Sequence, residues 1–172
     1  MSNKLLFSKT RDVKSPVRAH STDAGIDFFL PNEFTYEDVE HSQDVTGTPL
    51  IFDTKQRGDI IIPSHGSLLI SSGIKMIVPP GHALIFTNKS GVAAKKHLLV
   101  GSCVVDSDYR GETFIQLINT SAMAIHVSPG EKIVQGIIYE VCSYPPTEVD
   151  DIMNYSKVTE RGEGGFGSTG VK

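Results

Sequence analysis

The stretch His97–Ser121, HLLVGSCVVDSDYRGETFIQLINTS, decides how this chain folds. Two runs within it, Leu98–Val105 and Thr113–Ile118, are rich in branched apolar residues, a composition typical of β-strands. Between them, Asp106–Gly111 places two carboxylates, a phenol ring and a guanidinium in one short loop. The pattern predicts a β-hairpin with a rigid polar tip. Most such loops are only solvated turns, so the rest of the chain must show whether this one has a function.

Short apolar runs separated by Pro and Gly continue on both sides of this stretch, with the rhythm of an all-β sandwich or barrel. Strands are expected at Lys4–Phe7, Ile26–Leu30, Asp59–Pro63, Ser67–Ile70, Ile74–Val78, Ala83–Asn88, Ala124–Val127 and Lys132–Val141. The alanines and lysines that follow Asn88 predict one short helix. The fold class is therefore predicted to be all-β.

The composition describes an ordinary globular protein, because 172 residues suffice for one domain with a real core. Lys and Arg number 16 and Asp and Glu number 20, which argues against binding to nucleic acid. Neither a membrane-spanning apolar stretch nor a signal-peptide core is present, so we expect a cytoplasmic protein with no membrane contact. Cys103 and Cys142 lack CxxC spacing and lie among apolar residues, which predicts buried free thiols.

Two segments differ in composition from the strands. Residues 34–58 are polar except for an apolar island at Leu50–Phe52, which predicts an inserted loop or an extra hairpin rather than core. The tail RGEGGFGSTGVK contains too much glycine to hold a structure by itself. We therefore expect a β domain over residues 1–155 and a flexible C-terminal arm over residues 156–172.

Several polar residues stand where the sequence allows two interpretations. Asp27 lies in the strand IDFFL, where it would face solvent or pair with a cation. Lys89, Ser90 and Gly91 at the start of the helix have the composition of an anion site, but taken alone these residues favour a capped helix with solvated lysines. Gln135 interrupts the apolar run IVQGII and would form a structural hydrogen bond or contact a ligand.

The order and residue types of these stretches resemble the five motifs of the trimeric dUTPase family, the deoxyuridine 5′-triphosphate nucleotidohydrolases. The matching segments are Ala24–Asp27, Lys89–Ala93, Gly101–Glu112, Pro129–Gln135 and Arg161–Gly170. The resemblance covers nearly the whole chain except residues 34–58. It implies a jelly-roll-like (β-clip) barrel with one short helix and a flexible C-terminal arm. It also implies a homotrimer with active sites at the subunit interfaces.

The resemblance further implies hydrolysis of dUTP to dUMP and pyrophosphate. Asp106 matches the family's catalytic carboxylate, which orients and deprotonates the attacking water. Tyr109 would pack against the deoxyribose and exclude a 2′-hydroxyl, and backbone groups along Ser102–Val105 and at Phe114 would read the uracil. The remaining matches are substrate-binding positions at Lys89, Ser90, Gly91, Cys103, Gln135, Arg161, Phe166, Gly167, Ser168 and Thr169.

The resemblance implies Mg²⁺ as the cofactor, carried on the triphosphate itself. Asp27 would then contact the metal through a metal-bound water, or hold the structure of the site. Two positions depart from the family pattern: Lys89 replaces the usual Arg and loses its bidentate fork, and Cys103 replaces a common Gly beside the base. Residues 34–58 have no matching segment and would form a surface hairpin, a trimer contact or a docking site for a protein partner.

Two other functions compete with this interpretation. A dCTP deaminase shares the fold and the loop Asp, but it uses a glutamate in a Leu-Glu-x-x-Asn pattern. Here the corresponding stretch Ile115–Asn119 contains Gln116, which cannot shuttle protons. A non-catalytic regulator built on the same fold would bind a partner through residues 34–58. Asp106 and the intact tail argue against loss of activity, although a second, binding role could coexist with catalysis.

Overall fold

The computed structural model describes residues 5–39, 42, 51–53, 58–101, 104–155 and 159. The chain divides into two units, Met1–Cys142 and Ser143–Lys172, and each is described by itself. The predicted boundary at residue 155 stays a prediction.

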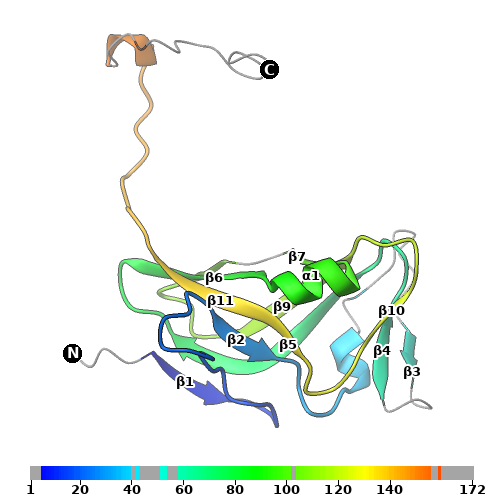
Figure 1. Cartoon of the computed structure of the whole chain (residues 1–172). Coiled ribbons are helices and arrows are strands. Elements are labelled where there is room, and N and C mark those ends of the chain that lie inside the picture. Colours follow the sequence, from blue (N-terminus) through cyan, green and yellow to red (C-terminus); the bar gives the residue numbers. More distant parts are fainter. Residues whose placement is uncertain are drawn as a thin grey trace. The chain divides into compact units, whose positions relative to one another are not determined.

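The first unit consists mainly of antiparallel strands with one short helix (Figure 1). One four-stranded sheet has the order β1 (Leu6–Lys9), β5 (Ser67–Ile77), β9 (Glu112–Asn119) and β7 (Leu98–Val100). The other has the order β2 (Ile26–Phe29), β11 (Lys132–Glu140), β6 (His82–Asn88) and β8 (Val104–Asp106). A three-stranded sheet contains β10 (Ile125–Val127), β4 (Asp59–Ile62) and β3 (Ile51–Asp53). The short segments are the 3-10 turn η1 (Tyr36–Val39) and the helix α1 (Ser90–Lys96).

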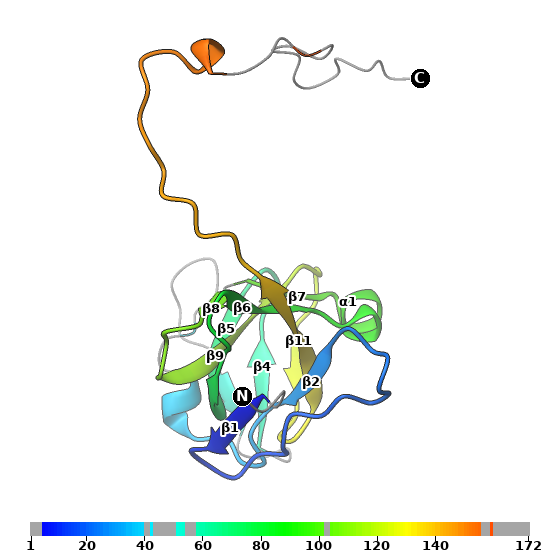
Figure 2. The same ribbon diagram turned by 90° about the vertical axis from the view of Figure 1, so that its left-hand side faces the viewer.

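The predicted all-β class with a single short α-helix is confirmed, and the strands just named form three sheets rather than a closed barrel. Alternation of side chains builds the core: in β9 every second residue, from Thr113 to Asn119, is buried. Both four-stranded sheets contribute to one core, Ile70 and Leu117 from the first and Leu84 and Ile133 from the second. Figure 2 shows β2 and β11 apart from β5 and β9.

Strand β5 is continuous where the sequence predicts two strands separated by Gly73. This glycine has φ +73°, in the left-handed region, and the register with β9 shifts between Ser71 and Lys75. A β-bulge therefore accommodates the glycine without ending the strand.

The predicted hairpin is only half right. Strand β7 pairs with β9, with Val100 opposite Leu117, as expected. Strand β8, however, pairs with β6 in the other sheet, with Val105 opposite Leu84. The polar loop Asp106–Gly111 thus connects the two four-stranded sheets. A run of branched apolar residues predicts strands but does not specify their partners, which is why the sequence missed this crossing.

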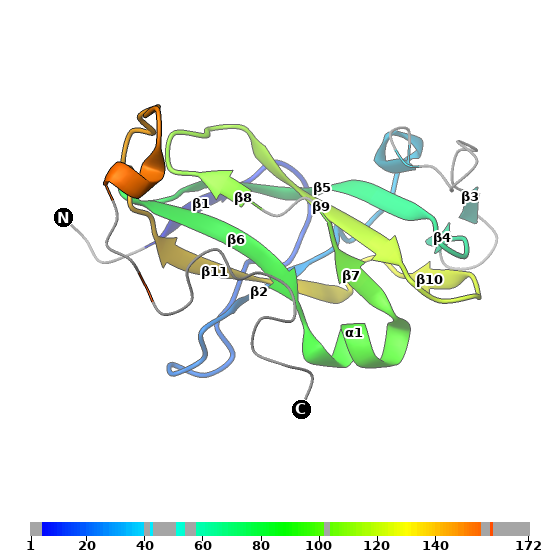
Figure 3. The same ribbon diagram turned by 90° about the horizontal axis from the view of Figure 1, so that it is seen from above.

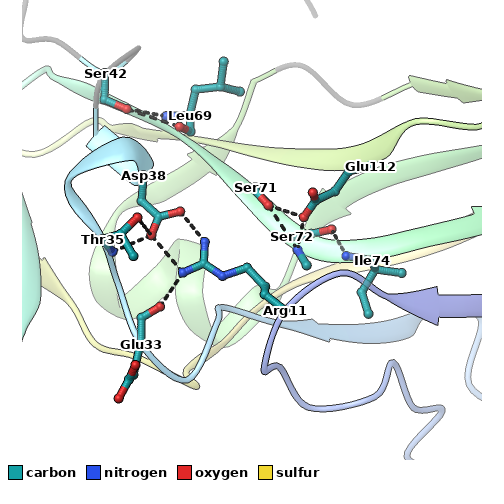
Figure 4. Close-up of polar contacts among 11 residues, drawn as sticks. Arg11, Glu33, Thr35, Asp38, Ser42, Leu69, Ser71, Ser72, Ile74 and Glu112 are labelled. Atoms are coloured by element: carbon teal, nitrogen blue, oxygen red, sulfur yellow. Dashed lines mark hydrogen bonds and ion pairs between the residues drawn. The ribbon is translucent and has the colours of Figure 1, made fainter.

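The first part of the segment 34–58 is packed into the domain, which corrects the expectation of a surface insertion. Phe34 and Val39 belong to the core. The Arg11 guanidinium binds both oxygens of Asp38 at 2.5 and 3.0 Å (Figure 4). Strand β3 pairs with β4, which agrees with the alternative of an extra hairpin.

In the second unit the described residues form one 3-10 turn, η2 (Ile152–Asn154). Asp151 begins this turn, and its side chain accepts a hydrogen bond from the Met153 N–H at 2.8 Å. At the end of the first unit, Cys142 is exposed, so the prediction of a buried thiol is wrong there, and Cys103 lies outside the described residues. No helix in the described ranges is long and apolar enough to cross a membrane.

Candidate active site

A cavity of about 210 Å³ opens between the ends of β8 and β9 and the loop that joins them. Its lining residues are Phe86, Val104, Val105, Asp106, Tyr109, Glu112, Thr113 and Phe114. Four of these residues, Val105, Asp106, Tyr109 and Phe114, are site residues predicted from the sequence. The structure therefore brings the predicted catalytic carboxylate and the predicted nucleoside contacts together.

Hydrogen bonds inside the polar loop hold it in one shape. The Tyr109 N–H donates to the Asp106 carbonyl at 3.2 Å, and the Tyr109 hydroxyl donates to the Glu112 carbonyl at 2.8 Å. The Arg110 guanidinium donates to the carbonyls of Ser107 and Tyr109 at 2.7 and 2.9 Å. The loop is thus closed by hydrogen bonds between its own residues.

Gly111 allows the Tyr109 ring to lie across the loop. A Cβ atom at Gly111 would lie 2.3 Å from the Tyr109 hydroxyl oxygen, so a larger residue would displace the ring. Tyr109 and Phe114 remain 42% and 46% exposed, and Phe86 is buried beneath them. Exposed aromatic faces beside a cavity suit a flat apolar ligand group, and the exposed Asp106 carboxylate is accessible to water.

A second polar cluster surrounds Asp27 on β2. This carboxylate is 5% exposed and accepts hydrogen bonds from the ammonium groups of Lys89 and Lys132, the latter at 2.9 Å. Burial acts to raise the pKa of Asp27, but the hydrogen bonds and charges of the two lysines outweigh it and hold the pKa below its ordinary value. The solvent-facing interpretation of Asp27 is wrong, and pairing with cations is correct.

Gln135 joins this cluster from β11, where it lies opposite Asp27. Its Nε2 donates to the Asn88 carbonyl at 2.9 Å, so Gln135 makes a structural hydrogen bond. A Cβ atom at Gly25 would lie 2.1 Å from Gln135 Oε1, so this side chain can fit only beside a glycine.

Lys89 precedes helix α1, which begins with the predicted site residues Ser90 and Gly91. Lys89 provides no side-chain cap for the helix, because an ammonium group donates hydrogen bonds and cannot accept one from a backbone N–H. Its ammonium group binds Asp27, so Lys89 is not one of the solvated lysines of the alternative interpretation. Sequence reasoning did not list Lys132 among the site residues, although it lies inside the matching segment Pro129–Gln135. Only the pairing of β11 with β2 shows that it reaches Asp27.

Strand β8, which carries Asp106, pairs with the first half of β6, whereas helix α1 follows the end of β6 (Figure 3). Asp106 is the register partner of Ala83 near the start of β6, whereas Lys89 follows its last residue, Asn88. At about 3.3 Å per residue, Ala83 and Lys89 are roughly 20 Å apart. One copy of the chain therefore carries two separate groups of predicted site residues and does not bring Asp106 and Lys89 together.

Seven predicted site residues lie outside the described residues: Ser102, Cys103, Arg161, Phe166, Gly167, Ser168 and Thr169. In the part of the chain that the structure does describe, no three His, Cys, Asp or Glu side chains form a group that could hold a metal ion. Both oxygens of Asp27 are bound by ammonium groups.

Comparison with protein families gives a match of residues 46–170 to the family model described as dUTPase. The mitochondrial deoxyuridine 5′-triphosphate nucleotidohydrolase of Dictyostelium discoideum is 36% identical over 121 residues, which are 70% of this chain and 65% of that protein. The Arabidopsis thaliana deoxyuridine 5′-triphosphate nucleotidohydrolase is 38% identical over 127 residues, 73% of this chain and 74% of that protein. The match thus spans just under two thirds of the Dictyostelium relative.

Solved structures agree on the fold. A dUTPase mutant of Staphylococcus bacteriophage 80alpha, in complex with dUpNHpp, has a TM-score of 0.74 and 22% identity, covering 99% of this chain and 100% of that one. A mutant dUTPase of phage phi11 has a TM-score of 0.65 and 18% identity, and the match covers 87% of this chain and 98% of that one. That structure details the coordination of a structural Mg(II) ion. At these identities the likeness shows that the fold is shared.

Proposed function

This chain belongs to the dUTPase family, and we propose on that basis that it hydrolyses dUTP to dUMP and pyrophosphate. Such an enzyme limits the incorporation of uracil into DNA and supplies dUMP for dTMP synthesis. The observation that carries the proposal is the cavity at the end of β8, where the exposed Asp106 carboxylate lies beside the fixed ring of Tyr109.

The cavity is the nucleoside half of the proposed site. Asp106 orients a water molecule and accepts its proton as the water attacks the α-phosphorus. The Tyr109 ring packs against the deoxyribose and leaves no room for a 2′-hydroxyl, which separates dUTP from UTP. Uracil lies beside Phe114 and is read by main-chain groups of Ser102–Val105, whose last residue lines the cavity.

The Asp27 cluster is the phosphate half of the proposed site. Two ammonium groups and one carboxylate leave one net positive charge there, which attracts a triphosphate. Lys89, Ser90, Gly91 and Gln135 supply donors for phosphate oxygens and stabilise the charge that develops on them. Lys132 joins this group because its ammonium lies on the same carboxylate as that of Lys89.

Assembly of copies completes the proposed site. The roughly 20 Å along β6 between Ala83 and Lys89 supports a site in which one copy's cavity faces another copy's Asp27 cluster. We infer a homotrimer with three such sites. The C-terminal arm of the third copy closes over the nucleotide and excludes water: Phe166 and Gly167 at the base, and Arg161, Ser168 and Thr169 at the phosphates.

Magnesium is proposed to arrive with the triphosphate. Bound to the triphosphate, Mg²⁺ would neutralise part of the phosphate charge and make the phosphorus more susceptible to attack. Asp27 would hold a metal-bound water, or it orients Lys89 and Lys132, whose ammonium groups it binds. We also propose a cytoplasmic location. Contact of residues 34–58 with a protein partner stays a prediction.

The test incubates the full chain with dUTP, dCTP or UTP and Mg²⁺, and measures pyrophosphate and ammonia. We expect pyrophosphate from dUTP, little from UTP and none from dCTP. The matched variant Asp106→Asn should lose at least about a hundredfold in turnover while still binding a non-hydrolysable dUTP analogue. Pyrophosphate from dCTP, ammonia from dCTP, no reaction at all, or a near-normal rate for Asp106→Asn would contradict the proposal.

A further inference from the structure

Glu112 is a charged residue that lines the cavity and has no role in the reaction described above. Its Oε1 atom accepts a hydrogen bond from the Gly73 N–H at 2.7 Å and another from the Ser71 hydroxyl (Figure 4). Both donors belong to the bulge of β5, where the register with β9 shifts. A hydrogen bond to an ionised acceptor is stronger than a neutral one, so this carboxylate ties the start of β9 firmly to the bulge.

The bulge provides a fixed anchor for Glu112 because its other groups are also held. The Ile74 N–H donates to the Ser72 hydroxyl at 3.1 Å. A Cβ atom at Gly73 would lie 2.9 Å from both Arg11 Cγ and Val13 Cγ1, so these side chains pack directly behind the bulge. The bulge therefore has little freedom to move with the loop.

The other end of Glu112 holds Tyr109. The main-chain carbonyl of Glu112 accepts the hydrogen bond from the Tyr109 hydroxyl at 2.8 Å, and the Tyr109 ring lies directly over Gly111. The position of the ring therefore depends on the position of the Glu112 main chain, which the Glu112 side chain fixes on β5.

We propose that the Glu112 carboxylate is a positioning residue that holds Tyr109 at the distance needed to distinguish deoxyribose from ribose. This inference rests on the proposed function. Rejection of one hydroxyl group by steric contact requires a ring that cannot retreat, since a small displacement makes room for the extra oxygen. Loss of the carboxylate should thus affect the choice between dUTP and UTP more than the reaction itself.

The experiment measures kcat and KM for dUTP and UTP with the full chain and four variants. In Glu112→Ala the preference for dUTP, as a ratio of kcat/KM values, should fall about tenfold, the effect of losing about 1.4 kcal/mol of selective interaction. Glu112→Gln should keep the preference within about twofold of that of the unmodified chain, because its amide oxygen can accept the same two hydrogen bonds. Ser72→Ala is the control, because it removes the hydrogen bonds of the bulge to Ile74 N–H and to the Thr113 hydroxyl and leaves those of Glu112 in place.

A purely structural role would make Glu112→Ala and Ser72→Ala alike. We expect both variants to lower the thermal unfolding midpoint, and only Glu112→Ala to lower the preference for dUTP. Adding Tyr109→Phe to Glu112→Ala should cost little further preference, because both changes break the same connection.

The outcomes separate this inference from the function on which it rests. If the unmodified chain hydrolyses dUTP and Glu112→Ala retains its preference over UTP, the positioning role is overturned and the proposed function stands. An equal loss of preference in Ser72→Ala would also overturn it. If the unmodified chain releases pyrophosphate from no nucleotide, the proposed function fails and this inference fails with it.

Discussion

Asp27 shows at the scale of one residue how a carboxylate can be buried in a strand. An unpaired buried carboxylate would cost several kcal/mol, but two ammonium groups bind this one. The side chains of Lys89 and Lys132 stay 23% and 45% exposed, so they remain partly hydrated while they neutralise Asp27. Burial of the Asp27 carboxylate therefore costs little free energy, and the cluster as a whole carries a net positive charge.

Replacing Asp27 with Asn should lower the free energy of unfolding at pH 7 by about 2 kcal/mol, because two lysines lose a charged acceptor. The pKa of Asp27 in the folded chain lies below its ordinary value of 3.8, so its stabilisation is present above that value and is lost as pH falls through the lower folded pKa. Urea unfolding from pH 7 to pH 3 measures this difference.

Asp23→Asn is the control for this experiment, because Asp23 lies in the turn that precedes β2 and its contact with His20 is largely exposed to solvent. Its unfolding free energy should stay close to that of the unmodified chain at neutral pH. A difference between Asp27→Asn and the unmodified chain that grows as the pH falls would contradict the ion-pair account.

At the scale of the element, the bulge in β5 depends on Gly73. Its φ of +73° is unfavourable for a residue with a side chain, and Arg11 and Val13 occupy the space that a Cβ atom would need. The same glycine donates its N–H to Glu112. One backbone position thus serves both the core and the cavity.

Gly73→Ala should lower the free energy of unfolding by about 3 kcal/mol, of which about 1–2 kcal/mol is the conformational term and the rest is the steric contact. Gly81→Ala is the matched control: its φ is +75°, but nothing lies within 4 Å of a Cβ atom there. It should lose only the conformational term. Chemical denaturation measures both variants, and equal losses would show that the packing behind Gly73 is unimportant.

Most strands could be predicted from the alternation of apolar residues, but their partners could not. Gly73 looks like a break in the sequence, because only the pairing with β9 reveals a bulge. Val104 and Val105 continue the apolar run of β7, yet they pair with β6. The motif residues Asp106 and Tyr109 could be identified by type and spacing. Lys132 and Glu112 could not, because their contacts depend on the register between strands distant in sequence.

At the scale of the whole molecule, the separation of the cavity from the Asp27 cluster makes the single chain an incomplete enzyme under the proposed function. Asp106 pairs with Ala83 near the start of β6, and Lys89 follows the end of β6. Sites shared between copies can be tested by mixing two inactive variants, because each variant then supplies what the other lacks.

Asp106→Asn and a chain truncated before Arg161 should each be nearly inactive alone. When the two are unfolded and refolded together in equal amounts, about a quarter of the sites should combine an intact Asp106 with an intact arm, if copies assort at random. Pyrophosphate release from dUTP measures the recovery. The control refolds each variant separately. No recovery in mixed oligomers would contradict an arm supplied by another copy.

Between β8 and β9 the chain crosses from one sheet to the other, and this crossing makes the shape of the cavity depend on the core. One wall of the cavity belongs to the sheet of β6 and the other to the sheet of β5, and the hydrocarbon interior lies between these sheets. Phe86 lines the cavity and packs edge-on against Phe28 deeper inside, with 4.9 Å between ring centroids. The bulk of the interior side chains thus affects the width of the cavity, and substitutions in the core, far from the polar loop, can widen or narrow it.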